Sequence, residues 1–140
     1  MVVQVDALHP QHALICVMMI MSAVDRNISD RELGIMGQLV RTLPVFDDFD
    51  PEEVVSVSED CARLLQREDG LNQVLARVAR SLSPALKETA YALAVELAAV
   101  DGSASQEELR LLELIRHSLP VDRLIAAGIE RGARARYHRQ

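Results

Sequence analysis

Two stretches of the chain are apolar on almost every side, the pattern of helices that are buried all round. Residues 13–24 contain no charged side chain and follow Pro10, a residue suited to the first turn of a helix. Residues 84–100 follow Ser83, a helix-capping residue, and leave almost no polar face in their second half. We therefore predict that these two helices lie at the centre of the fold and contact each other.

An amphipathic segment follows each apolar stretch. Each segment opens with a serine and, three residues later, a glutamate, which is the pattern of a capping box. Apolar side chains then recur at helical spacing until a proline ends the segment. The pattern predicts two helices that each bury one stripe. The capping pairs are Ser29 with Glu32 and Ser105 with Glu108, and the stripes are Leu33, Met36, Val40 and Leu43 in the first helix and Leu109, Leu112, Ile115 and Leu119 in the second.

Three further helices are predicted between and after these segments. Asp50 and Pro51, an N-cap and a first-turn proline, open a helix that should reach about residue 67. After a break at residues 69 and 70, residues 71–82 predict a shorter helix whose inward side chains are Val74, Leu75, Val78 and Leu82. A last helix over about 121–131 precedes a tail that we expect to be frayed.

The two halves of the chain align with each other at an offset of 76 residues. This alignment pairs AVDRNISDREL at residues 23–33 with AVDGSASQEEL at residues 99–109, and it continues without a gap to Pro44 and Pro120. Duplication of one supersecondary unit explains such self-similarity. We therefore predict an all-α fold of about seven helices, with two pseudo-symmetric helix-loop-helix repeats around the central apolar pair.

One domain over residues 1–140 is the predicted organisation, because a chain of this length suits a single hydrophobic core. Repeat one covers about 10–68, a linking helix about 70–82, repeat two about 84–131, and a basic C-terminal tail 132–140.

The doubled motif resembles the TerB-like proteins associated with tellurite resistance. Each copy has an apolar helix that ends near an Ala-x-x-Asp-Gly pattern, a small capping residue, and an acidic start to the next helix. The resemblance covers roughly residues 10 to 130, and the first copy departs from the pattern with Arg26 where glycine is usual. It implies an all-helical, non-enzymatic protein linked to stress and metal-resistance systems near membranes.

Composition constrains the core and the compartment. The four aromatic residues are Phe46, Phe49, Tyr91 and Tyr137, so the core must be mainly aliphatic. Cys16 and Cys61 show no CxxC spacing and predict two reduced core thiols in a reducing compartment. Residues 13–24 are shorter than the roughly 20 residues of a membrane span, and no basic residue precedes them. We expect a cytoplasmic protein without a cleaved leader.

Charge is distributed unevenly along the chain. The formal net charge of −6 argues against general nucleic-acid binding. Seven acidic residues and no basic residue lie between Thr42 and Ala62. The last ten residues carry four arginines, Arg131, Arg134, Arg136 and Arg139, and three of them lie in the basic tail. This tail could be solvated, meet an anionic lipid surface or a nucleic acid, or fold back on the acidic segment of its own chain or of a second copy.

Two acidic pairs are the strongest candidates for chemistry: Asp25 with Glu32, and Asp101 with Glu108. In the favoured interpretation each aspartate accepts hydrogen bonds from its own loop and each glutamate closes a capping box. In the alternative, the same oxygens bind a divalent cation, and the two loops pool four carboxylates in a shared site. No other cofactor is expected.

A flat face is predicted on the first amphipathic helix, where Gly34, Gly37 and Arg41 lie on one side. Glycine inside a helix costs about 1 kcal/mol relative to alanine, so close approach of another helix is a reasonable use. That helix would be the next one or the one after it in this chain, or a helix of a partner.

Catalytic motifs are missing from the sequence. No P-loop, GxGxxG, HExxH or triad spacing occurs, and the four histidines do not pair with a nucleophile or an acid. We predict a non-enzymatic interaction module whose partners are other proteins, including membrane-associated ones, with a homodimer as a further option. The alternative is a divalent-metal-binding protein that uses the doubled acidic loops.

Overall fold

A computed structural model describes residues 7–23, 30–100, 102 and 104–140. These residues form helices and loops, with no β-strand among them. The elements in chain order are α1 (Pro10–Ala23), α2 (Asp30–Thr42), η1 (Pro44–Phe46), η2 (Pro51–Glu53), α3 (Val54–Leu65), α4 (Gly70–Ser81), α5 (Pro84–Ala99), α6 (Gln106–Ser118) and α7 (Arg123–Arg136). The predicted all-α class with seven α-helices is therefore confirmed for the described part of the chain.

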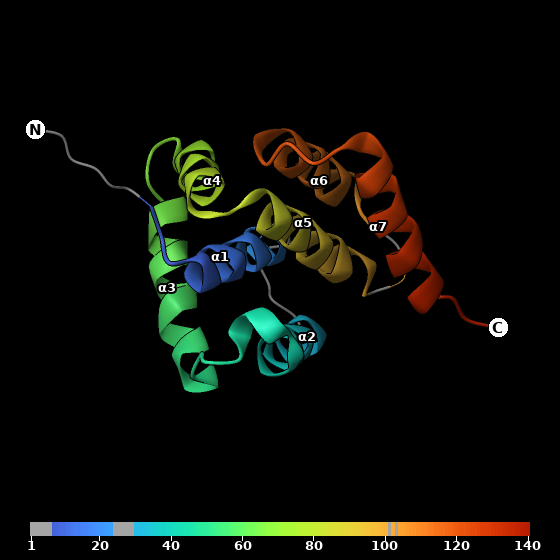
Figure 1. Cartoon of the computed structure of the whole chain (residues 1–140), viewed down its shortest axis with the longest axis horizontal. Helices are drawn as coiled ribbons and strands as arrows, with labels where there is room; N and C mark the ends of the chain where they lie inside the picture. The colour runs from blue at the N-terminus through green and yellow to red at the C-terminus, as the bar shows by residue number, and fades with distance from the viewer. Residues whose placement is uncertain (1–6, 24–29, 101, 103) are drawn as a thin grey trace, which may run out of the picture.

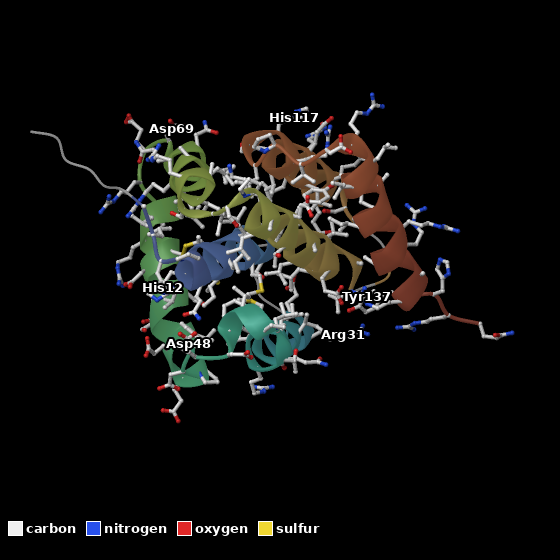
Figure 2. The ribbon with its side chains drawn as sticks, in the orientation of Figure 1. His12, Arg31, Asp48, Asp69, His117 and Tyr137 are labelled. Carbon is white, nitrogen blue, oxygen red and sulfur yellow. A yellow bond between two sulfur atoms is a disulfide. The ribbon has the colours of Figure 1, made fainter. Side chains whose placement is uncertain are left out.

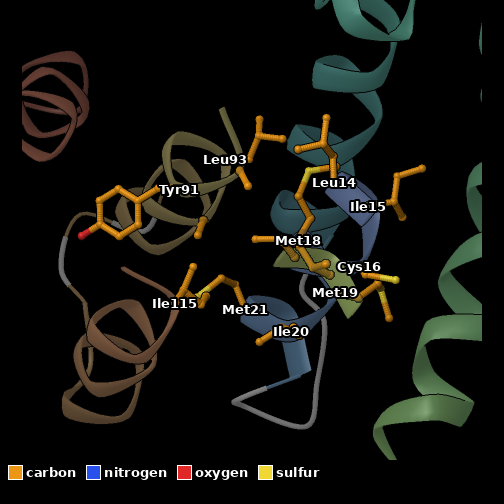
Figure 3. Close-up of a cluster of buried hydrophobic side chains, with 14 of the residues drawn as sticks. Leu14, Ile15, Cys16, Met18, Met19, Ile20, Met21, Tyr91, Leu93 and Ile115 are labelled. Atoms are coloured by element: carbon orange, nitrogen blue, oxygen red, sulfur yellow. The ribbon is translucent and has the colours of Figure 1, made fainter. Parts of the chain in front are cut away.

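The two apolar helices α1 and α5 lie side by side in the middle of the molecule (Figure 1). Helices α3 and α4 pack against α1, whereas α6 and α7 pack against α5. Side chains from both central helices and from α6 point into one apolar cluster that includes Leu14, Met18, Leu93 and Ile115 (Figure 3). The prediction of a central, mutually contacting helix pair is correct, because neither helix has a polar face that could be left in water.

Helix starts follow the predicted caps wherever the structure describes them. Asp50 Oδ1 accepts a hydrogen bond from the Glu52 amide at 2.9 Å, and Ser83 Oγ accepts one from the Leu86 amide at 3.2 Å. At α6 the capping box is complete, with the Glu108 amide donating to Ser105 Oγ at 3.1 Å and the Ser105 amide donating to Glu108 Oε1 at 2.8 Å. Ser29 lies outside the described residues.

Loss of the α6 cap should have a measurable cost. Replacing Ser105 with alanine removes the acceptor of the Glu108 amide and should lower the free energy of unfolding by about 1 kcal/mol, measured by urea denaturation. If the two halves are equivalent units, Ser29→Ala should cost the same amount. A large loss for only one of the two variants would contradict that equivalence.

Two predicted inward positions are wrong, and they are wrong in the same way. Leu33 and Leu109 are 52% and 48% exposed, although both were expected in the buried stripes. One residue earlier, Glu32 and Glu108 are buried at 4% and 8%. In a helix, residues four positions apart lie on the same face. Glu32 therefore shares the buried face with Met36, and Leu33 falls at the edge of the buried stripe.

The cysteines also differ from the expectation. Cys16 of α1 and Cys61 of α3 are joined by a disulfide, with their Cα atoms 5.6 Å apart, rather than lying as separate reduced thiols. Packing of α3 against α1 brings the two positions together although 45 residues separate them in sequence. The sequence argument for a reducing compartment therefore has no support in the structure.

The last helix is longer than predicted and includes much of the basic tail. Helix α7 continues to Arg136 instead of ending near Arg131. Arg136 forms an ion pair with Glu96 of α5, and the Tyr137 hydroxyl donates to the same carboxylate. These contacts hold the end of α7 against the central helix, so residues 132–136 are helical where fraying was expected.

Candidate functional site

An apolar groove runs between α2 and α3. It has a volume of about 400 Å³, and Met19 of α1 lies in its wall with residues from both helices. Leu33 on α2 and Val55 on α3 line it and are 52% and 65% exposed. The charged side chains in its wall are Arg41 and Glu59. Large apolar side chains that stay half exposed in a groove are typical of a surface that binds another protein segment.

The glycine face of α2 contributes to this groove at one position. The space where a Cβ of residue 37 would stand lies 3.3 Å from the Arg41 guanidinium, while a Cβ at residue 34 would meet no atom within 4 Å. The predicted close approach by the next helix of the chain is therefore wrong: Gly37 is covered by Arg41 of its own helix, and Gly34 faces open space.

A second, larger cleft lies between α5, α6 and α7, with a volume of about 750 Å³. Its wall contains buried apolar side chains, among them Val95, Leu112 and Ala133. It also contains the charged side chains Arg110, Glu113, Arg116, Glu130 and Arg134. The two clefts thus differ in chemistry, one almost apolar and the other strongly polar above an apolar floor.

The two clefts correspond to each other at the offset of 76 residues found in the sequence. Helices α2 and α6, each 13 residues long, begin at residues 30 and 106 and so differ by this offset. Cleft residues also match in pairs at this offset: Met19 with Val95, Leu33 with Leu109, Met36 with Leu112, Gly37 with Glu113, Val54 with Glu130, Ser58 with Arg134, and Ala62 with His138. The matching positions have diverged mainly by gaining charge in the second half.

Both tyrosines of the chain line the larger cleft. Tyr91 is 2% exposed, and its hydroxyl donates a hydrogen bond to Glu130 of α7. Burial, reinforced by the hydrogen bond and the negative charge of Glu130, raises the pKa of Tyr91 well above its ordinary value, although Arg116 acts in the opposite direction. Tyr137 lies at the end of α7, beside α5 (Figure 2). Sequence periodicity could not reveal this cleft, because it is formed by three separate helices.

The raised pKa of Tyr91 predicts a specific loss of stability at alkaline pH. The folded protein keeps this phenol protonated to a higher pH than the unfolded chain does. The contribution of Tyr91 to the free energy of unfolding is therefore constant below about pH 10, where the unfolded tyrosine ionises, and declines as the pH rises further. Urea unfolding of the unmodified protein and of Tyr91→Phe should therefore give a difference in free energy that is constant from neutral pH and changes above about pH 10. A difference independent of pH would contradict this.

The structure describes only half of each acidic pair. Glu32 and Glu108 lie in the first turns of α2 and α6, are almost fully buried, and are separated by the offset of 76 residues found in the sequence. Glu108 acts as the second member of a capping box, as the favoured interpretation requires. Asp25 and Asp101 lie outside the described residues. Among the residues that are described, no group of three or more His, Cys, Asp or Glu side chains is placed to hold a metal ion.

The acidic segment and the end of the basic tail lie on opposite sides of the molecule. Asp48, within the acidic segment, and Tyr137, after the last turn of α7, are far apart in Figure 2. Arg136 pairs with Glu96 and not with the acidic segment. The acidic side chain in the wall of the α2/α3 groove is Glu59 of α3.

In the described part of the chain, no helix has the length and apolar character needed to cross a membrane. The described residues define an all-helical architecture in which five α-helices pack around the central pair α1 and α5, with one cleft beside α2 and another beside α6. The chain belongs to the TerB family, because the family model described as "Tellurite resistance protein TerB" matches residues 11–127. Neither the curated proteins nor the solved structures gave a match.

Proposed function

We propose that this TerB-family protein is a non-enzymatic interaction module of a stress-response or tellurite-resistance assembly, and that it binds a partner protein through the α2/α3 groove. The observation that carries this proposal is the pair of half-exposed apolar side chains, Leu33 and Val55, that face one groove. Covering such side chains removes apolar surface from water, at about 25 cal/mol per Å².

The chemistry of the groove favours an apolar helix flanked by one basic and one acidic residue as its occupant. A volume of about 400 Å³ suits a few apolar side chains rather than a folded domain. Glu59 and Arg41 both lie in the wall. Charged side chains in the wall attract residues of opposite charge and determine the orientation of the bound segment more than its affinity.

A matched pair of variants tests this docking surface. Val55→Asp places a charge in the groove, whereas Leu124→Asp makes the same kind of change on α7 at a residue that is 83% exposed and outside the groove. Tagged protein recovered from its native cell should lose a specific partner at least about tenfold in Val55→Asp and retain it in Leu124→Asp. If both variants recover the partner equally well, the α2/α3 groove is not the docking surface.

Divalent-cation binding is the second candidate function. It is favoured by one observation: the carboxylates Glu32 and Glu108 are buried at equivalent positions, each seven residues after an aspartate of the motif. Buried carboxylates need hydrogen bonds or a cation to offset the loss of hydration. The capping box of Glu108 supplies such hydrogen bonds without a metal.

Calorimetric titration with calcium, magnesium, zinc and manganese separates these two functions. Stoichiometric binding that disappears in the double variant Asp25→Asn, Asp101→Asn would establish a metal site. If the doubled acids serve only as caps and loop acceptors, no ion binds, and the double variant remains as stable as the unmodified protein because asparagine keeps an acceptor oxygen.

A further inference from the structure

We propose that the cleft between α5, α6 and α7 binds a small organic anion that carries its charge at one end of an apolar body, such as a medium-chain carboxylate. The cleft is separate from the α2/α3 docking groove, and its volume of about 750 Å³ falls within the range of small-molecule sites.

The floor of the cleft suits an apolar body. Val95 and Ala98 of α5, Leu112 of α6 and Ala133 of α7 are each less than a tenth exposed and border the cleft. They belong to three different helices that the core already fixes in position. Leu109 of α6 also lines the cleft and is 48% exposed, so a ligand could cover apolar surface without a rearrangement of the backbone.

Three arginines on the walls supply the positive charge. Arg110 and Arg116 lie on α6, and Arg134 lies on α7 across the cleft. At the matching positions of the first half the chain has Gly34, Val40 and Ser58. Guanidinium groups on facing helices are suited to a carboxylate, because each can donate two parallel hydrogen bonds to its oxygens.

The two carboxylates in the cleft reduce this charge but do not cancel it. Glu130 accepts the hydrogen bond from the Tyr91 hydroxyl, which partly satisfies it, and Glu113 is exposed on α6. Arg116 lies close enough to Tyr91 for its charge to act on the hydroxyl. Three guanidinium groups against two carboxylates leave the lining positive within a chain whose net charge is −6.

The chain carries its own reporter for this site. It contains no tryptophan, and its two tyrosines, Tyr91 and Tyr137, both line the cleft. Intrinsic fluorescence of the unmodified full chain therefore reports on this region alone. Octanoate is the probe, and octanol is the matched control because it has the same carbon chain without the charge.

Octanoate should change the tyrosine emission saturably, and octanol should bind at least about tenfold more weakly. Arg134→Ser, which introduces the residue found at the matching position of the first half, should weaken octanoate binding about tenfold. Arg131→Ser, on the same helix but outside the cleft lining, removes the same charge and should have little effect. Circular dichroism checks that both variants stay folded.

Three results would overturn the proposal. The first is equal binding of octanoate and octanol, which would reduce the cleft to an unspecific apolar surface. The second is equal weakening by Arg134→Ser and Arg131→Ser, which would indicate general charge attraction. The third is unchanged tyrosine emission together with no bound octanoate in equilibrium dialysis.

Discussion

Replacing Leu14 with alanine is expected to lower the free energy of unfolding by about 2–5 kcal/mol. Leu14 is fully buried on α1 and points into the cluster shared with α5, where Leu93 lies (Figure 3). The change removes three buried carbon atoms and leaves a cavity, because the two central helices cannot close on each other without moving the helices around them. Urea denaturation measures the loss.

Leu124→Ala is the matched control for this prediction. It makes the same chemical change at a side chain that is 83% exposed on α7, and it should alter the free energy of unfolding by less than about 0.5 kcal/mol. Similar losses for both variants would mean that α1 is not the buried centre of the fold. A loss for Leu124→Ala alone would mean that α7 is covered by another molecule.

Removing the disulfide is expected to have an effect of similar size. In the double variant Cys16→Ala, Cys61→Ala the free energy of unfolding should fall by about 2–4 kcal/mol, because a covalent link across 45 residues no longer restricts the unfolded chain. The replaced sulfur atoms are also buried, so a small packing loss adds to the effect. Urea denaturation without reductant compares the variant with the unmodified protein.

The reduced, unmodified protein provides the control for this experiment. Dithiothreitol should bring its stability down towards that of the double variant and should leave the double variant unchanged. Before reduction, a thiol titration in denaturant should find no free thiol, because Cys16 and Cys61 are the only cysteines of the chain. Two titratable thiols and no effect of reductant would show that the link is absent.

Most of the fold could be predicted because its signals are local. Residues 13–23 and 90–98 are apolar on almost every side, so both segments require burial whatever surrounds them. Caps such as Ser83 and Ser105 act within one turn of chain, so a short pattern is enough to locate a helix start. The offset of 76 residues likewise predicted two matching amphipathic helices, and α2 and α6 begin at that separation.

Features that depend on how helices meet could not be predicted. Cys16 and Cys61 form a bond only because α3 packs on α1 in one register, and no spacing rule contains that information. Leu33 was assigned inward because a hydrophobic residue is expected inside, whereas Glu32 occupies the inward position of that turn. The capping-box pattern assigned Glu32 and Glu108 to helix starts but did not show that their side chains are buried.

The candidate sites were only partly visible in the sequence. The doubled acidic pairs were found by repetition, yet Asp25 and Asp101 lie outside the described residues. Val55 gave no signal, since valine beside Val54 at a helix start fits a buried position equally well. The larger cleft could not be predicted from the sequence because three helices form it. Its charge does show in the sequence, since three of its lining arginines stand where the first half of the chain has Gly34, Val40 and Ser58.

Site-specific photo-crosslinking in the native cell tests the docking function most directly. Benzoylphenylalanine at position 55 would stand in the α2/α3 groove, and the same residue at position 124 would stand on the exposed face of α7. We predict a discrete crosslinked product at position 55, absent at position 124, whose mass identifies one partner protein or a second copy of the chain. No product at position 55, or the same products at both positions, would contradict a docking role for the groove.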